Sequence, residues 1–269
     1  MSAYSEYQTL LLEVTPEGIA VVTLNRPERA NSMTVTMFDE FSLLARELTA
    51  DQAIRCVVIT GAGSVFCPGY DIDKATELSD MTVIEFLNLQ ENASTGLQAI
   101  RALRVPVIAA VNGAAAGGGL SLALVADIRL ADPSAKFSAA FSRIGLSAGD
   151  LGASWLLTRL VGPGVAAELA FTGRLVLAEE AARIGLVNSV SEAGAVLDDG
   201  LAMARLICAN SPAGVRVSKS ALRLNQEINS YAAASELENR GQALLTRTSD
   251  MPEALAAFRE RRPANFTGN

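Results

Sequence analysis

One uncharged stretch, residues 105–126, limits what this chain can fold into more than any other feature. It starts with Pro106 and β-branched residues, passes Asn112 and three consecutive glycines at 117–119, and ends in a leucine-rich segment before Asp127. The pattern predicts a buried strand, a glycine turn and a buried helix. Consecutive glycines let the backbone approach a ligand closely, and the first turn of the helix offers N–H groups to an anion. A tight crossover, in which glycine only permits close packing, explains the stretch equally well.

The length of this stretch also permits a transmembrane helix. Asn112 and the glycines fall at its centre, so two buried elements explain it better. The first seven residues lack the basic segment and the apolar core of a secretory signal. We therefore expect a cytoplasmic protein that does not engage a membrane.

The composition excludes several kinds of chemistry. No histidine occurs among the 269 residues, which removes Ser-His-Asp and Cys-His catalysis and every imidazole metal site. Cys56, Cys67 and Cys208 are widely spaced, which argues against a disulfide framework and a cysteine zinc site. A net charge of −7 makes a nucleic-acid partner a poor expectation. No metal is expected, and acid-base chemistry falls to the carboxylates.

Two glycine patterns resemble nucleotide-binding motifs, and each fails at a specific position. Gly61-Ala62-Gly63 follows a predicted strand, but the next glycine of a dinucleotide fingerprint would fall on Phe66. Gly113 and Gly118 have phosphate-loop spacing, but Gly119 stands where the lysine of that loop belongs. Neither a dinucleotide site nor a nucleoside triphosphate site is predicted.

Strand and helix patterns alternate along the chain, which predicts an α/β fold. Apolar runs at 9–14 and 19–24 flank Pro16-Glu17-Gly18 and predict a hairpin. A helix follows, with Asn31 or Ser32 as its N-cap. Its apolar face comprises Met37, Phe38, Phe41, Leu44 and Leu48. Further on we expect a strand at 54–60, a helix over about 81–104 with Val83, Ile84, Phe86, Leu87, Leu97, Ile100 and Leu103 as apolar positions, and C-terminal helices over 195–209, 213–225, 231–246 and 252–259.

Several short motifs, each weak alone, occur in one order along the chain. They are Leu24-Asn25-Arg26-Pro27 with Asn31, Phe66-Cys67-Pro68-Gly69-Tyr70-Asp71-Ile72, Asn112-Gly113 with the glycines at 117–119 and Asp127, and segments at 157–162, 171–174 and 181–187. Their order and spacing resemble the crotonase, or enoyl-CoA hydratase/isomerase, superfamily from about residue 9 to 266. The resemblance implies a ClpP/crotonase-like spiral of repeated ββα units over 1–192. It also implies a helical oligomerisation region over 193–269 that builds trimers or hexamers.

The resemblance also implies a site. Superfamily members bind acyl-CoA thioesters and polarise the thioester carbonyl between two backbone N–H groups, which correspond here to Tyr70 and Gly118. One such donor lowers a barrier by about 3 to 4 kcal/mol. Arg26, Ala30, Pro68 and Tyr70 correspond to residues along the CoA, with Arg26 as its phosphate partner or, alternatively, a solvated loop arginine. CoA belongs to the substrate, so no separate cofactor is expected.

The catalytic acids depart from the hydratase pattern. The two glutamates of classical hydratases correspond here to Ser121 and Phe141, and hydration needs both a base and an acid. Asp150 is the predicted substitute, since dienoyl-CoA isomerases and 4-chlorobenzoyl-CoA dehalogenases place an aspartate at about this point. Facing an apolar pocket, it would have a raised pKa and act as base, acid or nucleophile. Its alternative role is to cap the helix around 155–160, as Asp71 is a candidate cap for the helix after it.

The roles of the neighbouring side chains follow from the same resemblance. Phe141 is expected to line the pocket, and Ser121 to hold a water or fill space. The ring of Tyr70 either narrows the acyl channel or turns outward. Lys219 and Phe266 are expected, by analogy, to reach the CoA of a neighbouring subunit.

The sequence therefore predicts a lyase or isomerase of fatty acid metabolism that hydrates or isomerises an enoyl-CoA, with Asp150 as the titrating group. A dienoyl-isomerase or aroyl-dehalogenase reaction at Asp150 is one alternative. A non-catalytic acyl-CoA-binding protein is another, because the binding residues remain where the glutamates are missing. A third is an unrelated α/β protein whose glycines are structural.

Overall fold

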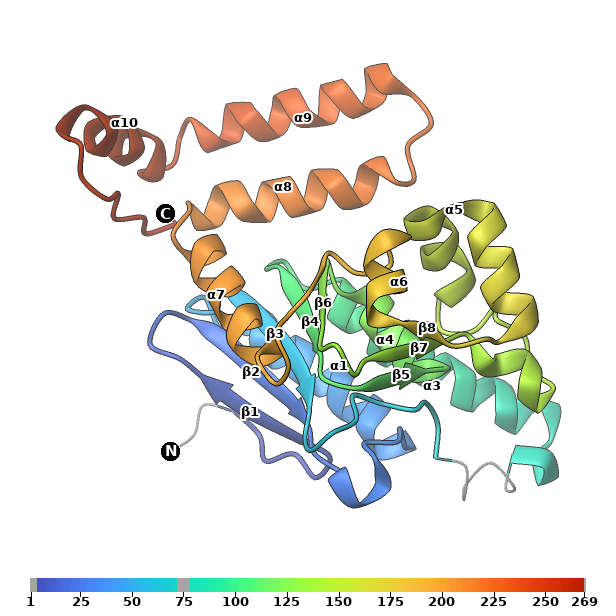
Figure 1. Cartoon of the computed structure of the whole chain (residues 1–269). Coiled ribbons are helices and arrows are strands. Elements are labelled where there is room, and N and C mark those ends of the chain that lie inside the picture. Colours follow the sequence, from blue (N-terminus) through green and yellow to red (C-terminus); the bar gives the residue numbers. More distant parts are fainter. Residues whose placement is uncertain (1–3, 72–77, 269) are drawn as a thin grey trace.

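The computed structural model describes residues 4–71 and 78–268, and two sheets with surrounding helices form its core (Figure 1). The main sheet has the order β1-β2-β3-β4-β6-β9, and the smaller sheet the order β5-β7-β8. The strands are β1 (Leu10–Val14), β2 (Ile19–Leu24), β3 (Cys56–Gly61), β4 (Val107–Val111), β5 (Ala114–Ala116), β6 (Ile128–Ala131), β7 (Lys136–Ser138), β8 (Val176–Leu177) and β9 (Ser189–Val190). The hairpin β1-β2 is antiparallel, as predicted, and the rest of the main sheet is parallel.

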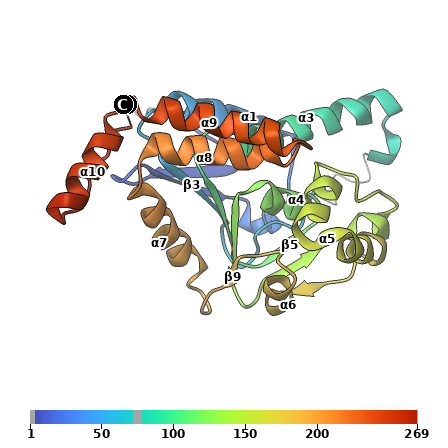
Figure 2. The same ribbon diagram turned by 90° about the horizontal axis from the view of Figure 1, so that it is seen from above.

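Helices cover both faces of the main sheet. The helices of the described residues are α1 (Val35–Ala50), α3 (Val83–Arg101), α4 (Gly118–Val125), α5 (Ala153–Thr172), α6 (Ala178–Arg183), α7 (Val196–Cys208), α8 (Pro212–Asn225), α9 (Tyr231–Leu245) and α10 (Asp250–Glu260), with 3-10 turns η1 (Pro27–Arg29) and η2 (Ala140–Ile144). Side chains alternate across β3: Val57 and Ile59 enter the large core that α1, α3 and α4 share, whereas Cys56 and Val58 face α7. α7 packs on one face of the main sheet. The helices after it, α8 to α10, extend from the core (Figures 1 and 2).

One unit repeats along the chain: a main-sheet strand, a short strand of the small sheet, then a helix. β4-β5-α4 and β6-β7-α5 are two copies. In a third, β3 is followed by Cys67, which bridges to Ala115 of β5 in parallel, and then by α3. This repetition is the α/β spiral that the resemblance implied. The division at 192/193 into two regions stays a prediction.

Two predictions about helix starts and membrane crossing are corrected. The N-cap of α1 is Thr34, whose hydroxyl accepts from the N–H of Met37 at 3.3 Å, so the predicted cap at Asn31 or Ser32 is wrong. Residues 105–126 form strand, short strand and helix, so the transmembrane alternative is wrong too. Across residues 4–71 and 78–268, no helix is both long enough and apolar enough to traverse a bilayer.

The apolar face predicted for α3 is buried only in its second half. Leu97, Ile100 and Leu103 are buried, whereas Val83 and Ile84 at the first turn are exposed. Thr82 and Glu85 form a capping box that stabilises this end without help from the core. The first half of α3 is therefore not covered by the core, and part of it forms one wall of a cavity that is described below.

Candidate active site

The small sheet brings three turns to one edge. Cys67 pairs in parallel with Ala115 of β5, and β5 pairs in parallel with β7. Because parallel strands end at the same edge, the turns that follow Cys67, Ala116 and Ser138 lie side by side. The N–H of Gly117 donates to the oxygen of Ser138 at 3.0 Å and joins two of these turns. Segments far apart in the sequence, including both predicted oxyanion donors, therefore meet at one place.

The first two turns touch beside the predicted oxyanion donors. A Cβ atom on Gly69 would lie 3.2 Å from the amide nitrogen of Gly118 and 3.0 Å from the oxygen of Ala116. The φ of Gly69 is 104°, a conformation that other residues rarely adopt. Gly118 is the first residue of α4, where an N–H has no acceptor within the helix. The peptide that joins Gly69 to Tyr70 thus lies next to the amino end of α4.

Gly119 sets how closely α4 approaches the first turn. A Cβ atom there would lie 1.9 Å from the main-chain oxygen of Cys67, so only glycine fits. That oxygen also accepts from the N–H of Ala116 at 3.1 Å. Both interpretations of the glycine stretch thus have a basis: Gly119 serves close packing, and Gly118 stands at the end of α4 where an anion would bind.

A buried carboxylate ties the first turn to the loop of residues 26–33. Asp71 Oδ2 accepts from Arg26 Nη2 at 3.2 Å and from Ser32 Oγ at 3.0 Å, and Oδ1 accepts from Arg29 Nη2 at 3.1 Å. Burial alone raises the pKa of the Asp71 carboxyl, but hydrogen bonds from Arg29, Ser32 and Arg26 outweigh it and bring the pKa to about 2. The carboxylate is therefore ionised at physiological pH. Residues 72–77, which include Ile72 of the motif, lie outside the described residues.

The residues predicted along the CoA surround this loop. The Arg26 side chain is 19% exposed and donates to the oxygen of Ser32 at 2.5 Å. Arg29, which the sequence analysis overlooked, is 41% exposed and is the more open of the two guanidiniums. Arg29 lies three residues after Arg26 in the same loop, and this spacing could have marked it in the sequence as a second candidate phosphate partner. Ala30 ends η1 with a left-handed backbone at φ 53°, and Pro68 is exposed.

Asp150 precedes α5 and lies over the amino end of α4. Its main-chain oxygen lies 3.4 Å from the hydroxyl of Ser121 and accepts from the N–H of Ala153 at 2.8 Å. The N-cap of α5 is Gly152, so the alternative in which the Asp150 carboxylate caps this helix is wrong. The main-chain oxygen of Asp150 accepts from the first N–H of α5, so the Asp150 carboxylate is not used to cap this helix.

The carboxylate of Asp150 interacts with α3. Burial raises its pKa, and hydrogen bonds from the side chain of Gln90 and the main chain of Leu151 offset only part of that rise. Leu151 has a φ of 48°, and its Cδ1 lies 3.4 Å from where a Cβ on Gly118 would be. Asp150, whose carboxyl has a raised pKa, therefore precedes Leu151 in the chain, and the Leu151 side chain lies beside Gly118, one of the two predicted oxyanion donors. Sequence reasoning missed Gln90 and Leu151, because neither belongs to a motif.

A cavity of about 680 Å³ opens between α3 and the loop 146–151. Its walls include Phe86, Leu87, Gln90, Leu146, Asp150 and Leu151. Four apolar side chains, Phe86, Leu87, Leu146 and Leu151, line it together with polar side chains from α3 and from the loop, and its volume is of the order of a small-molecule site. Among the residues that the structure describes, no three histidine, cysteine or acidic side chains are placed to hold a metal ion.

The remaining predicted site residues lie in the core around the turns. Ser121 is fully buried, and its hydroxyl lies 3.4 Å from the oxygen of Gly117. Phe141, on η2, is 3% exposed, and a ring carbon lies 3.8 Å from where a Cβ on Gly117 would be. The ring of Tyr70 stacks on Phe38, with centroids 6.3 Å apart, and so packs against α1.

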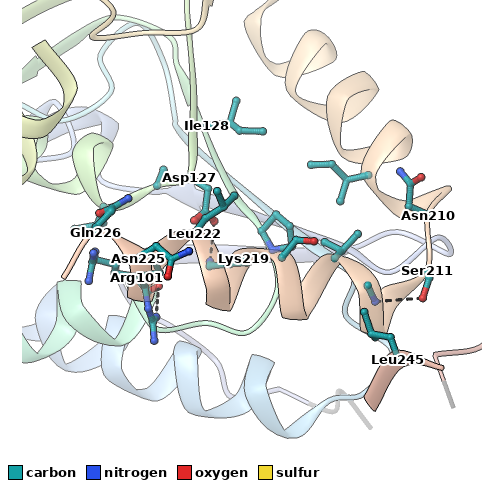
Figure 3. Close-up of a pocket in the computed structure, with 18 of the residues that line it drawn as sticks. Arg101, Asp127, Ile128, Asn210, Ser211, Lys219, Leu222, Asn225, Gln226 and Leu245 are labelled. Atoms are coloured by element: carbon teal, nitrogen blue, oxygen red, sulfur yellow. Dashed lines mark hydrogen bonds and ion pairs between the residues drawn. The ribbon is translucent and has the colours of Figure 1, made fainter. Parts of the chain in front are cut away.

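A larger cavity, about 1270 Å³, lies between α8 and the segment that joins α4 to β6 (Figure 3). Lys219 Nζ lies 2.7 Å from Asp127 Oδ2 and donates to the oxygen of Val105 at 2.8 Å. Burial lowers the pKa of the Lys219 ammonium, and Asp127 offsets part of that change. Within the chain Lys219 is thus held by Asp127 and Val105, and its expected contact with a neighbouring subunit's CoA stays a prediction. Phe266 lines the same cavity. The smaller cavity remains the candidate site because Asp150 and Leu151 line it, and Leu151 also packs next to Gly118.

Comparisons with known proteins agree on one family. The enoyl-CoA hydratase/isomerase family model matches residues 14–269. The probable enoyl-CoA hydratase EchA12 of Mycobacterium tuberculosis is 40% identical over 268 residues, which cover 98% of this chain and 94% of the relative. The 1,2-epoxyphenylacetyl-CoA isomerase of Escherichia coli is 34% identical over 259 residues, which cover 96% and 98%.

The same likeness extends to solved structures. The crystal structure of enoyl-CoA hydratase from Bacillus anthracis matches with a TM-score of 0.92 at 30% identity, covering 97% of this chain and 100% of that one. Family model, relatives and architecture therefore coincide over nearly the whole length. The chain has the crotonase fold and belongs to the enoyl-CoA hydratase/isomerase family.

Proposed function

We propose that this protein moves a proton within an enoyl-CoA thioester. The N–H groups of Tyr70 and Gly118 would hold the thioester oxygen, and Asp150 would be the acid-base group. The observation that carries the proposal is the position of Asp150, whose burial raises its pKa and whose side chain borders a cavity beside the amino end of α4. A carboxyl group with a raised pKa is a better general base near neutral pH than an ordinary aspartate.

The proposed chemistry is migration of a double bond. The Asp150 carboxylate removes a proton from the α-carbon of a 3-enoyl thioester, and the electron pair of that C–H bond passes into the carbonyl to form a dienolate. Two fixed N–H donors and the end of α4 stabilise the negative charge on oxygen. The protonated carboxyl then returns the proton to the γ-carbon, which leaves a 2-enoyl thioester and regenerates Asp150. The step is redox-neutral and needs no cofactor besides the CoA of the substrate.

The residues at 121 and 141 favour isomerisation over hydration. Hydration by the usual route needs one group to deprotonate water and another to protonate the α-carbon, but Ser121 and Phe141 stand where the resemblance places the two glutamates. A single carboxylate suffices for a proton that leaves one carbon and returns to another. The E. coli relative is named an isomerase, whereas the M. tuberculosis relative is named a hydratase, so hydration with Asp150 alone is the second candidate.

The CoA would lie along the loop of residues 26–30 and Pro68. Positive charge there comes from Arg26 and Arg29, within a chain whose net charge is −7. Arg26 is held by Asp71 and Ser32, so the more exposed guanidinium of Arg29 is better placed to meet a phosphate. Both arginines would thus support the phosphates, Arg26 by shaping the loop and Arg29 by contact.

A homo-oligomer, a trimer or a hexamer of two trimers, is part of the proposal. None of the 15 residues of α9, all of which the structure describes, is buried. Leu222 on α8, Leu244 on α9 and Phe258 on α10 are 71%, 70% and 84% exposed. Further copies of the chain would cover this apolar surface, because helices in proteins gain most of their stability from packing.

A direct assay tests the function. The purified protein is incubated with 3-enoyl-CoA and 2-enoyl-CoA esters of several chain lengths, and the products are separated and identified by mass. A shifted double bond at unchanged mass supports the proposal, whereas a product heavier by one water favours hydration. Calorimetric binding of the esters without any turnover would identify an acyl-CoA-binding protein instead. Absence of binding would contradict every version of the proposal.

A further inference from the structure

We infer that Asp71 is a positioning residue, which holds the Gly69–Tyr70 peptide in the orientation that an oxyanion requires. The inference rests on the proposed function and adds a residue to it. It comes from the way in which the turn of residues 68–71 is fastened to the loop of residues 26–33. Asp71 would contact neither the substrate nor the reacting atoms.

The orientation of the Tyr70 N–H follows from a hydrogen bond on the opposite side of its own peptide. Gly69 contributes the C=O of that peptide, and this oxygen accepts from the N–H of Met33 at 2.8 Å. In a planar trans peptide the C=O and the N–H point in opposite directions. The N–H of Tyr70 is therefore directed away from the main chain of Met33. Anything that shifts Met33 relative to Gly69 rotates this donor.

A second main-chain bond completes the attachment. The N–H of Asp71 donates to the oxygen of Met33 at 3.0 Å, so Met33 and Tyr70 form a parallel bridge. The side chain of Met33 is buried, and its sulfur lies 3.0 Å from where a Cβ on Gly118 would be. One residue of the loop therefore holds the peptide that carries the Tyr70 N–H and also packs next to Gly118.

The loop itself is held in an unusual conformation. Ala30 and Asn31 have φ values of 53° and 62°, which non-glycine residues rarely adopt. The buried Asn31 accepts from the N–H of Arg26 at 2.9 Å and donates to the oxygens of Ala62 and Val65 at 2.9 and 2.7 Å. These contacts anchor the loop to the segment that leaves β3 and leave its far end, at Ser32 and Met33, to be fastened to the turn.

The Asp71 carboxylate supplies that fastening. It is the point on the turn to which Arg26, Arg29 and Ser32 all donate, and Asp71 is only 4% exposed. Removing its charge would leave two guanidiniums of the loop without their carboxylate, so the loop would lose the ion pairs that hold it to the turn. Charge at this position, rather than side-chain shape alone, is therefore what orients the donor.

Asp71→Asn tests the inference, because it keeps the shape and removes the charge. Acetoacetyl-CoA is the probe. Its enolate absorbs in the near ultraviolet, and the bound ligand holds more enolate than the free ligand at the same pH only when its oxygen is stabilised, so the band is measured as the excess over free ligand. We expect wild-type protein to show this band, and Asp71→Asn to lose about 10- to 100-fold in bound enolate and in kcat, as expected for a displaced donor. The band is compared at saturating acetoacetyl-CoA, because Asp71 also holds Arg26 and Arg29 of the proposed CoA loop and its loss is expected to weaken CoA binding.

Two further variants separate positioning from general damage. Ser32→Ala removes one neutral contact to the carboxylate, and with it a 3.2 Å hydrogen bond from Arg26 Nη1 to the hydroxyl. Arg26 keeps its ion pair with Asp71, so the variant should fold and lose about 2- to 10-fold in bound enolate. Glu180→Gln is the matched control, because Glu180, on α6, is also held by two arginines, Arg174 at 2.7 Å and Arg183 at 3.8 Å. It should keep the full enolate band.

The outcomes are distinguishable. A reduced band in Ser32→Ala and Asp71→Asn, with Glu180→Gln unchanged, supports the inference. A full band in both Asp71→Asn and Ser32→Ala would overturn it and leave the proposed function intact. If Asp71→Asn does not fold, a full band in Ser32→Ala overturns the inference by itself. Wild-type protein that binds acetoacetyl-CoA without any enolate band would contradict the oxyanion site, and the inference with it.

Discussion

The hydroxyl of Ser121 lies 3.4 Å from the main-chain oxygen of Asp150. The position at which the resemblance places a hydratase glutamate is therefore directly under the loop that presents Asp150. A short buried side chain at 121 leaves room for this loop to close over the amino end of α4. The carboxylate thus reaches this region from the loop before α5 instead of from α4 itself.

The first prediction concerns this contact. Ser121→Leu should push the Asp150 loop away from α4, because Ser121 is fully buried, and overpacking a core typically costs about 1 to 3 kcal/mol of stability. Turnover should fall with it. Ser121→Ala is the control and should keep turnover within about fivefold, since it removes only two long contacts, from the hydroxyl to the oxygens of Gly117 and Asp150 at 3.4 Å each. Chemical unfolding and enoyl-CoA turnover check both; an inactive but stable Ser121→Ala would instead give the hydroxyl a catalytic role.

Asp150→Asn should lower kcat by about 10²- to 10⁴-fold, the usual contribution of a general acid-base group. Affinity for the acyl-CoA should change less than twofold, because the oxyanion donors and the CoA loop remain. Turnover and calorimetry on the same preparation check this. Asp199→Asn, at an exposed position on α7, is the control and should retain wild-type kcat. An active Asp150→Asn would remove Asp150 from the mechanism.

The pH dependence follows from the direction of the Asp150 pKa shift. Burial raises this pKa, and a base acts only when deprotonated, so kcat/KM should fall on acidification at a pH above the ordinary aspartate value of about 3.9. Gln90→Leu should move the midpoint of this fall to higher pH, because the Gln90 hydrogen bond favours the ionised form. A pH–rate profile of both proteins measures the two midpoints. Coincident midpoints would contradict the role of Gln90.

The same shift makes Asp150 costly for stability. A folded-state pKa above the unfolded one means that the unfolded chain ionises first, so stability is highest below the unfolded pKa and decreases as pH rises through the folded value. Asparagine does not ionise and avoids this loss. Asp150→Asn should therefore have a higher Tm than wild type at neutral pH, and the difference should shrink toward pH 4. Scanning calorimetry across this range measures it.

The order of elements could be predicted because hydrophobic periodicity is a local property. The hairpin, α1, the strand at β3 and the four C-terminal helices all appear close to their expected positions. The features that local sequence did not predict, such as the N-cap of α1, depend on contacts between residues far apart in the chain. Asn31 is a good capping residue, but its amide is used by Ala62 and Val65, and Thr34 caps α1 instead.

The site was only partly accessible from sequence, for a related reason. Periodicity marks Phe86 and Leu87 as apolar but cannot distinguish a core face from a cavity wall. The contact between the turns of Gly69 and Gly118 depends on how Cys67 pairs with the small sheet, which local sequence does not specify. The hydrogen bond between Gln90 and Asp150 joins two elements that share no motif. Family resemblance supplied the donor positions, and the folded chain shows what surrounds them.

Neighbouring glycines should respond differently to one methyl group. At Gly119 a Cβ would meet the main chain of Cys67 at 1.9 Å, so Gly119→Ala should lose more than about 3 kcal/mol or fail to fold. At Gly118 a Cβ would meet the flexible ends of Met33 and Leu151 at 3.0 and 3.4 Å, so Gly118→Ala should fold. Its turnover should nevertheless fall at least tenfold, because the methyl crowds the oxyanion position. Unfolding midpoints and kcat of both variants test this contrast.

Self-association should depend on the exposed leucines of α8 and α9. Replacing Leu222 and Leu244, about 70% exposed each, by glutamate places charge on the surface that other copies would cover. Sedimentation velocity should show the wild type as a trimer or hexamer and the double variant as a smaller species. The helices themselves should persist by circular dichroism, since neither side chain is buried within the chain. Leu11→Glu, at an exposed site on β1, is the matched control and should not alter assembly; a wild type that sediments as a monomer would contradict the proposed oligomer.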